Sequence, residues 1–311
     1  MTSQSPRMIA VVGFGTIGMR WAAAFAHAGT AVRVHDPEPE CWKRFQAERD
    51  GLFHDLDTLH SHVHAPAPIS FHTELAAALD GADFVQENAP ERLELKQALL
   101  PRIEAHLPNH VVIASSSSAL LVSDMQRDCA RPERIVLGHP FNPAHLMPLV
   151  EIVGSARTAP EAIERARSIY EGMGKKPVVL NREVTGHLAL RLMGALWREA
   201  IALVASGVAT VEDVDRAFCY GPGPKWTLQG SFISNHLNAG GMEDFIAKYG
   251  ATYEAIWADL AGGAELTEAA RDAVVAGTRG AIGARQDSSL RKGRDEGLVA
   301  ILRAQDAHGA L

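Results

Sequence analysis

Three glycines near the N-terminus constrain the fold of this 311-residue chain more than any other feature. Gly13, Gly15 and Gly18 form a Gly-x-Gly-x-x-Gly pattern. The residues Met8–Val12 before them are all apolar, as expected for a strand buried on both faces. A helix-compatible stretch follows over residues 16–28. A strand, a glycine turn and a helix in this order predict the first unit of a doubly wound α/β sheet.

The context of the glycine turn predicts a dinucleotide site. A second strand candidate, Ala31–His35, ends at an acid, Asp36, about 20 residues after the turn. The three glycines permit a tight turn, a close approach to a pyrophosphate and close helix packing. The pyrophosphate would lie at the helix N-terminus, beside the free N–H groups of Thr16 and Ile17. Because the Asp36 carboxylate would bind ribose hydroxyls and repel a 2′-phosphate, we expect NAD as the cofactor.

The remaining sequence predicts two domains. Short apolar runs alternate with helical stretches in the first half, which favours a parallel sheet with right-handed crossovers. Further strand candidates are residues 84–86, 111–114, 135–138 and 150–153. From Val184 onward the pattern is almost wholly helical, as in residues 186–206, 210–218 and 266–282. We therefore expect a Rossmann-type NAD-binding domain over residues 1–182, then an all-helical substrate and dimerisation domain over residues 183–311.

Composition and charge bound the classes of partner. The chain is 47% hydrophobic and 22% charged, with a net charge of −7 and no long basic run, which disfavours nucleic acid and membrane surfaces. The segment before Arg7 is short and polar, and the apolar run after it breaks at Gly13, so we expect no signal peptide or membrane span. Cys41, Cys129 and Cys219 form no CxxC pair. A reducing, cytoplasmic location follows by default.

Five histidines between residues 54 and 72 suggest a metal cluster. They are His54, His60, His62, His64 and His72. Their spacing fits no single helix face, and no Cys ligand accompanies them. We therefore predict no metal site. Residues 61–68 are expected to form a loop because of their Pro content.

A second set of motifs lies between residues 87 and 151. It comprises Glu87-Asn88-Ala89-Pro90-Glu91, the serine run Ser115–Ser118, Gly138-His139-Pro140-Phe141-Asn142-Pro143 and Pro148-Leu149-Val150-Glu151. Together with residues 197–200 and 220–226, these motifs resemble the 3-hydroxyacyl-CoA dehydrogenase superfamily over nearly the whole chain. The chain is most similar to the branch that acts on free acids such as carnitine and L-gulonate.

The chemistry of alcohol oxidation and this resemblance together suggest roles for individual residues. His139 suits removal of the hydroxyl proton because imidazole titrates near neutral pH. Glu151 would accept the other ring N–H and stabilise the imidazolium. The resemblance implies that Ser118 hydrogen-bonds the reacting oxygen and that Asn142 lies beside the nicotinamide. It also implies cofactor contacts from Asn88, Glu91 and Lys96, the last two near the nicotinamide ribose.

The sequence departs from the family where the substrate is expected. The family usually has a polar residue, often Asn, in the first helix of the second domain, and the chain has Leu190 there. Since Leu cannot form a hydrogen bond, either His187 or Arg191 substitutes, or the substrate needs no contact at this point.

The predicted substrate is a small free 3-hydroxy acid, carnitine-like first and L-gulonate-like second. Acyl-CoA users of the superfamily carry a long basic helical hairpin, whereas residues 37–81 are short for that and contain few Lys or Arg residues. Lys225 could bind the carboxylate of the acid. The aromatic residues Phe141, Trp226, Tyr220 and Phe232 would form either a cage for a quaternary ammonium or ordinary core.

Other functions remain open at this stage. The protein could be a 3-hydroxyacyl-CoA dehydrogenase, or a non-catalytic NAD binder with a structural or redox-sensing role. A 3-hydroxyisobutyrate-type dehydrogenase ranks low because the helix from Gly186 contains no Lys. Apolar helices such as residues 188–204 predict a homodimer formed through the second domain.

Overall fold

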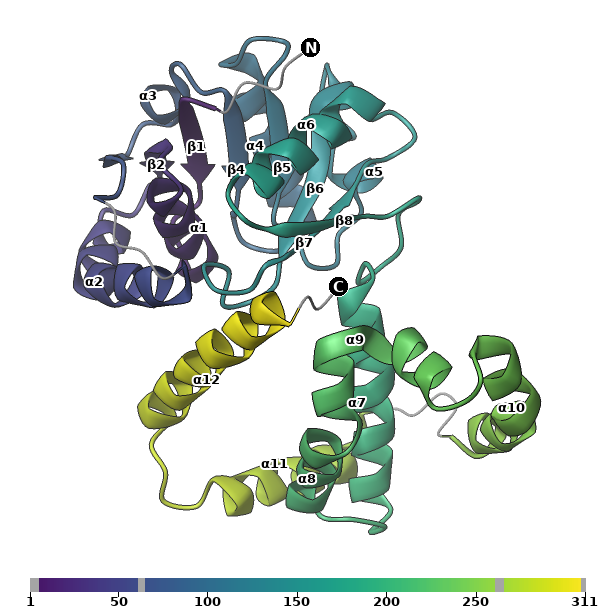
Figure 1. The fold of residues 1–311 in the computed structure, drawn as a ribbon. Coiled ribbons are helices and arrows are strands. Elements are labelled where there is room, and N and C mark those ends of the chain that lie inside the picture. Colours follow the sequence, from purple (N-terminus) through teal and green to yellow (C-terminus); the bar gives the residue numbers. More distant parts are fainter. Residues whose placement is uncertain (1–5, 61–64, 261–265, 309–311) are drawn as a thin grey trace. The chain divides into compact units, whose positions relative to one another are not determined.

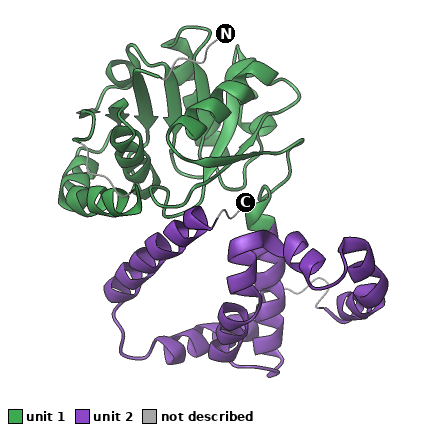
Figure 2. Ribbon diagram, viewed as in Figure 1, with its two compact units in different colours: residues 1–191 green, residues 192–311 purple. Residues whose placement is uncertain are grey.

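The computed structural model describes residues 6–60, 65–260 and 266–308. The chain divides into two compact units, residues 1–191 and 192–311 (Figure 2). The division falls inside a helix, α7 (Ala189–Ala205). The domain boundary at residue 182 stays a prediction. Each unit is described by itself below.

The first unit is built on a sheet of eight strands in the order β3-β2-β1-β4-β5-β6-β7-β8 (Figure 1). The strands are β1 (Met8–Val12), β2 (Ala31–His35), β3 (Ile69–His72), β4 (Phe84–Glu87), β5 (Val112–Ser115), β6 (Ile135–Pro140), β7 (Leu149–Val153) and β8 (Lys176–Val179). All neighbours pair in parallel except β6 and β7, which are antiparallel. The expectation of a parallel sheet was wrong for that pair, because residues 141–148 connect the two strands without a crossover helix.

Helices cover both faces of this sheet. They are α1 (Thr16–His27), α2 (Glu40–His60), α3 (Leu75–Leu79), α4 (Leu93–Ala105), α5 (Val122–Met125), the 3-10 turn η1 (Pro132–Arg134) and α6 (Pro160–Gly172). Alternate residues of β1 enter different cores. Ile9 and Val11 pack with residues of α1, α2 and α6, whereas Ala10 and Val12 pack with residues of α3, α4 and α5. This alternation confirms the doubly wound architecture.

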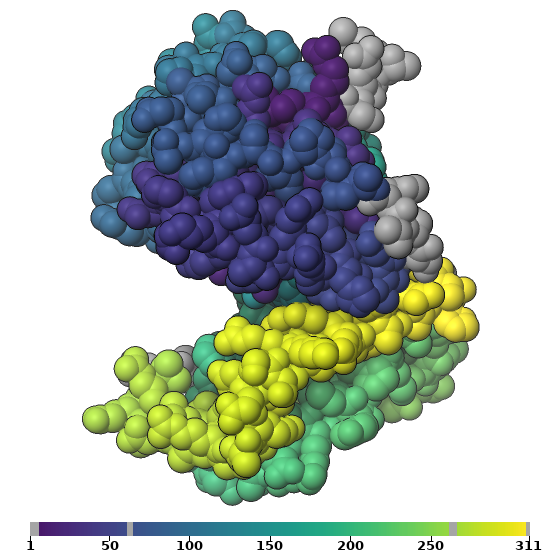
Figure 3. Space-filling view, turned by 90° about the vertical axis from the view of Figure 1, so that its left-hand side faces the viewer, coloured from purple at the N-terminus to yellow at the C-terminus, as the bar shows by residue number. Residues whose placement is uncertain are grey.

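The second unit consists of helices. After α7 come α8 (Val211–Tyr220), α9 (Pro222–Leu237), α10 (Met242–Asp259), α11 (Glu268–Ile282) and α12 (Asp287–Ala307). Thr210 caps α8 by accepting a hydrogen bond from the Asp213 N–H at 3.1 Å. In Figure 3, α12 runs across the surface of this unit. The side chain of Gln305 on α12 donates a hydrogen bond to the carbonyl oxygen of Thr227 on α9. Within the described ranges, no helix is both long and apolar enough to cross a membrane.

Candidate active site

The glycine turn has the geometry that a dinucleotide requires. Gly13 has a φ of +88°, and a Cβ on Gly18 would lie 2.0 Å from the Gly13 carbonyl oxygen. These two glycines are therefore needed for the turn and for helix packing. A Cβ on Gly15 would meet no atom within 4 Å. This open space lies at the N-terminus of the 12-residue helix α1. It suits a pyrophosphate, because the first turn of that helix has no acidic residue that would repel the phosphates.

Asp36 is held beside this turn at the end of β2. Its Oδ2 accepts a hydrogen bond from the Phe14 N–H at 2.8 Å, and its Oδ1 accepts one from the Glu38 N–H at 3.0 Å. These two hydrogen bonds fix the carboxylate beside the glycine turn, and its contact with an adenosine ribose stays a prediction. Arg33 on β2 donates to the carbonyl oxygens of Ala77 and Asp80. Its guanidinium group is therefore bound within the protein and is not placed to bind a phosphate.

His139 and Glu151 are cross-strand neighbours. His139 on β6 pairs with Glu151 on β7 in the antiparallel ladder. The His139 Nδ1 lies 2.9 Å from the Glu151 Oε2, and both side chains are buried. The short connection between the strands therefore creates the pair, because it puts the two residues directly opposite each other.

The remaining contacts of Glu151 keep its carboxylate charged. Its Oε1 accepts hydrogen bonds from the N–H groups of Leu188 at 2.7 Å and Ala189 at 2.8 Å, where the chain enters α7. Burial alone would raise the pKa of Glu151, but the hydrogen bonds from His139 and from these two N–H groups outweigh it and lower the pKa. A charged carboxylate can only accept, so Nδ1 of His139 carries the proton. Nε2 of neutral His139 is then a base with no partner among the described residues.

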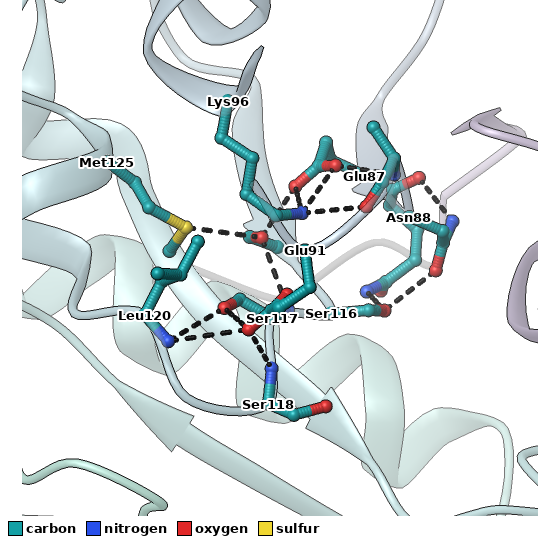
Figure 4. Close-up of polar contacts among 12 residues, drawn as sticks. Glu87, Asn88, Glu91, Lys96, Ser116, Ser117, Ser118, Leu120 and Met125 are labelled. Atoms are coloured by element: carbon teal, nitrogen blue, oxygen red, sulfur yellow. Dashed lines mark hydrogen bonds and ion pairs between the residues drawn. The ribbon is translucent and has the colours of Figure 1, made fainter. Parts of the chain in front are cut away.

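The serine run forms a loop after β5 that is fixed by Glu91. One oxygen of Glu91, Oε1, accepts hydrogen bonds from the Ser117 hydroxyl at 2.6 Å and from the N–H groups of Ser118 and Ala119, both at 2.9 Å (Figure 4). The pKa of Glu91 is lowered, since these bonds and the charge of Lys96 outweigh the effect of burial. The Ser118 hydroxyl takes part in no hydrogen bond with another described residue, so it is available to a ligand.

The ammonium group of Lys96 is hydrogen-bonded to other groups of the protein. Its ammonium donates to both carboxylate oxygens of Glu87 at 2.8 Å and to the Ala89 carbonyl at 3.1 Å, and its side chain is 1% exposed. Glu87 also accepts from the Ser115 hydroxyl at 2.5 Å. An ammonium has three N–H donors, and all three are used here by protein groups. A contact of Lys96 with the nicotinamide ribose stays a prediction. Lys96 and Glu87 form a buried ion pair close to Glu91 (Figure 4).

Two further predicted cofactor contacts have protein partners. The amide of Asn88 accepts from the Ser116 hydroxyl at 2.7 Å and donates to the Gln86 carbonyl at 2.9 Å. Asn142 is exposed, and its Oδ1 accepts from Arg20 on α1 at 2.5 Å. Gln86, Glu87 and Arg20 are site residues that the sequence reasoning missed. A carboxylate at the end of the short strand β4, next to the apolar pair Phe84-Val85, was the available signal for Glu87.

The candidate substrate residues are spread over the structure. The ring of Phe141 lies 6.4 Å from that of His139, in an edge-to-face arrangement. His187 is buried, and its Nε2 lies 3.1 Å from the Ser117 carbonyl oxygen. Arg191 is exposed on α7. Lys225 and Trp226 lie on α9 in the second unit, whereas His139 belongs to the first unit. Contact of Lys225 and Trp226 with the substrate stays a prediction.

Among residues 6–60, 65–260 and 266–308, no three His, Cys, Asp or Glu side chains are grouped so that they could hold a metal ion. His62 and His64 of the histidine-rich segment lie outside the described residues. Cys41, Cys129 and Cys219 are all free thiols.

Comparisons with known proteins agree over nearly the whole chain. It is 42% identical to an L-carnitine dehydrogenase of Streptomyces coelicolor over 308 residues, covering 98% of this chain and 96% of that protein. It is 38% identical to one of Bacillus cereus over 305 residues, covering 97% and 93%. A crystal structure of 5-formyl-3-hydroxy-2-methylpyridine 4-carboxylic acid 5-dehydrogenase, an NAD+-dependent dismutase, is similar with a TM-score of 0.85 and 27% identity, covering 96% of this chain and 98% of that one.

Both parts of the chain match models of one protein family. Residues 8–184 match the NAD-binding domain of 3-hydroxyacyl-CoA dehydrogenase, and residues 186–256 match its C-terminal domain. The glycine turn, Asp36 and the His139–Glu151 pair all lie in the first match. The chain thus has the sheet, the glycine turn and both family domains in the expected order. It belongs to the 3-hydroxyacyl-CoA dehydrogenase family.

Proposed function

We propose that this protein is an NAD-dependent dehydrogenase that oxidises the 3-hydroxyl of a small free hydroxy acid, with L-carnitine as the first substrate to test and L-gulonate as the second. The observation that carries the proposal is the charged Glu151 carboxylate, which leaves Nε2 of the neighbouring His139 as a free base. The fixed loop that presents the Ser118 hydroxyl supports the same reading.

The proposed mechanism assigns one task to each group. NAD, when bound, supplies the acceptor for the hydride that leaves the substrate carbon. His139 takes the hydroxyl proton at Nε2, and the imidazolium that forms is stabilised by Glu151 through Nδ1. Ser118 donates a hydrogen bond to the reacting oxygen as it becomes a carbonyl. Asn142, whose side-chain oxygen accepts a hydrogen bond from Arg20, would help to hold the nicotinamide.

Two features favour a free acid over a CoA thioester. The relatives at about 40% identity are named L-carnitine dehydrogenase. The helix α2, which follows β2, carries five acidic and three basic residues, so it is poorly suited to bind the phosphates of CoA. The acids are Glu40, Glu48, Asp50, Asp55 and Asp57, and the bases are Lys43, Arg44 and Arg49. In the second unit, Lys225 is a candidate for the carboxylate and Trp226 for a quaternary ammonium.

The experiment that tests this function is NAD reduction with a panel of substrates. The panel contains L-carnitine, L-gulonate, 3-hydroxybutyrate and 3-hydroxybutyryl-CoA, and NADH is followed by absorbance. We expect turnover with a free acid, and a kcat/KM at least on the order of a hundred times that for the CoA ester. A preference for the CoA ester would contradict the substrate class. NAD binding without turnover of any compound would instead favour the non-catalytic role.

The proposal includes the oligomeric state and the cellular location of the protein. We propose a cytoplasmic homodimer formed through the second unit. The reason for a dimer is that α7 has no buried side chain, while large apolar residues on it, such as Leu192 and Trp197, are 67% and 59% exposed. A second copy that covers these residues would remove that apolar surface from water.

A further inference from the structure

His187 is a buried histidine that the proposed mechanism does not use. It lies in the turn before α7, within the first unit, and it is 1% exposed. Its backbone φ is +50°, the left-handed region that favours glycine. Such a conformation is strained for a residue other than glycine and persists only where the surroundings enforce it. The contacts of the imidazole therefore indicate which role this conformation of His187 serves.

The imidazole bridges the two halves of the candidate site. Its Nε2 lies 3.1 Å from the carbonyl oxygen of Ser117, the residue before Ser118. Its ring centroid lies 5.3 Å from that of His139, with 52° between the ring planes. The next two residues, Leu188 and Ala189, donate their N–H groups to Glu151. One short segment thus contacts the serine loop, the base and the carboxylate that orients the base.

The protonation of His187 follows from these contacts. A carbonyl oxygen can only accept, so Nε2 must carry the proton. Nδ1 is buried and has no hydrogen-bond partner among the described residues, so a proton there would lack an acceptor. Burial also lowers the pKa of His187, although its bond to Ser117 opposes that effect. The ring is therefore neutral at pH 7 and places no second positive charge beside His139 when that residue takes its proton.

We propose that His187 is a positioning residue, which ties the Ser117–Ser118 loop to the His139–Glu151 pair and so fixes the hydroxyl of Ser118 relative to the base. The proposal deepens the proposed dehydrogenase function and rests on it. His187 does not touch the reacting atoms. It acts through the carbonyl oxygen of Ser117, which accepts its N–H, while the carboxylate of Glu91 accepts the N–H of Ser118 in the same loop.

The first test does not depend on activity. Hydrogen exchange read by mass spectrometry compares the wild type with His187→Phe, which keeps an aromatic ring but loses the N–H donor. We expect amides of the loop, residues 117–120, to exchange on the order of fivefold faster, as for the loss of one hydrogen bond. His187→Gln keeps an amide N–H near the same place and should restore slow exchange. His27→Phe is the matched control, since His27 is a buried histidine bonded to Asp57 outside this loop.

The second test is a double-mutant cycle with Ser118→Ala. His187→Phe alone should lower kcat on the order of fivefold while the KM for NAD stays within about twofold. When Ser118 is already Ala, His187→Phe should change kcat little further, because its effect passes through Ser118. If His187→Phe does not fold, His187→Gly serves instead, since glycine relieves the strained φ while removing the imidazole.

The outcomes separate this inference from the function on which it rests. Faster loop exchange with a coupled loss of kcat supports the positioning role. Unchanged loop exchange overturns it, as do multiplicative losses of kcat in the cycle or a loss of thermal stability alone. A wild type that oxidises no acid would refute the proposed function, and the exchange measurement would still decide whether His187 holds the serine loop.

Discussion

Glu151 contacts His139 through one carboxylate oxygen, and its other oxygen accepts two N–H groups at the start of α7. Replacing the acid by the isosteric Gln keeps its shape but removes the charge that stabilises the imidazolium. We therefore expect Glu151→Gln to lower kcat at least on the order of a hundredfold, measured in steady-state assays. Glu104→Gln is the matched control: Glu104 is also a buried acid that accepts N–H groups, but it lies elsewhere. A similar loss of kcat in both variants would contradict the role of Glu151.

The same carboxylate makes stability depend on pH. The pKa of Glu151 is lower in the folded protein than its ordinary value of 4.5. The unfolded chain thus binds this proton more tightly, so the ionised group stabilises the fold above about pH 4.5, and that stabilisation is lost as the pH falls through the folded value. We expect the free energy of unfolding lost in Glu151→Gln to be larger at pH 7 than at pH 4, as measured by urea denaturation. A loss that grows toward acid pH would contradict this sign.

Two of the three glycines of the turn, Gly15 and Gly18, should respond differently to replacement by Ala. Gly15 has an ordinary φ of −73° and open space at its Cβ, so Gly15→Ala should fold normally. The added methyl group would occupy the space for the pyrophosphate, and we expect the Kd for NAD in calorimetry to rise at least tenfold. A Cβ at Gly18 would clash with the Gly13 carbonyl, so Gly18→Ala should lower the melting temperature. Equal effects of both changes on stability would refute the assignment of the open space to NAD.

Asp36 should determine the choice between NAD and NADP. Its carboxylate is fixed beside the glycine turn by the N–H of Phe14, and its charge repels a 2′-phosphate. The wild type should therefore bind NAD more tightly than NADP in calorimetry. Asp36→Asn should raise the affinity for NADP relative to NAD on the order of tenfold. Tighter binding of NADP by the wild type would contradict this assignment.

The exposed apolar residues of α7 predict a dimer. Light scattering at micromolar concentration should give about twice the chain mass of 33.4 kDa. Trp197→Asp should shift the protein toward the monomer, because it puts a charge on the surface that the second copy covers. Arg198→Ala, on the same helix turn, is the control and should leave the mass unchanged. An active wild-type monomer would refute the dimer.

The sequence predicted the parts of the fold that have local signals. The first strand, the helix α1 and the second strand are close together in the chain and were all correctly anticipated. The strands β3 and β8 were missed because they lie at the sheet edges, where part of each strand faces solvent and the apolar run is broken. The direction of β7 was mispredicted, although the absence of a helical stretch between His139 and Glu151 was a usable signal.

The candidate site was predicted less completely, because its contacts join distant segments. The resemblance placed Lys96 near the nicotinamide ribose, but it gave no sign that the ammonium of Lys96 is bonded to Glu87, nine positions earlier. Arg20 contacts Asn142 across 122 positions, and His187 reaches Ser117 across 70. No propensity or spacing rule reports such pairs, since they depend on how the sheet brings strand ends together.

The most direct test of the central claim concerns His139. In His139→Ala, NADH production from the best acid of the panel should fall by on the order of a hundredfold to ten-thousandfold, because the general base is lost. Calorimetry on the same preparation should give a Kd for NAD within about twofold of the wild type, since His139 acts on the hydroxyl proton and not on the pyrophosphate. If His139→Ala keeps most of its activity, the proton leaves by another route and the assignment of His139 as the base is wrong.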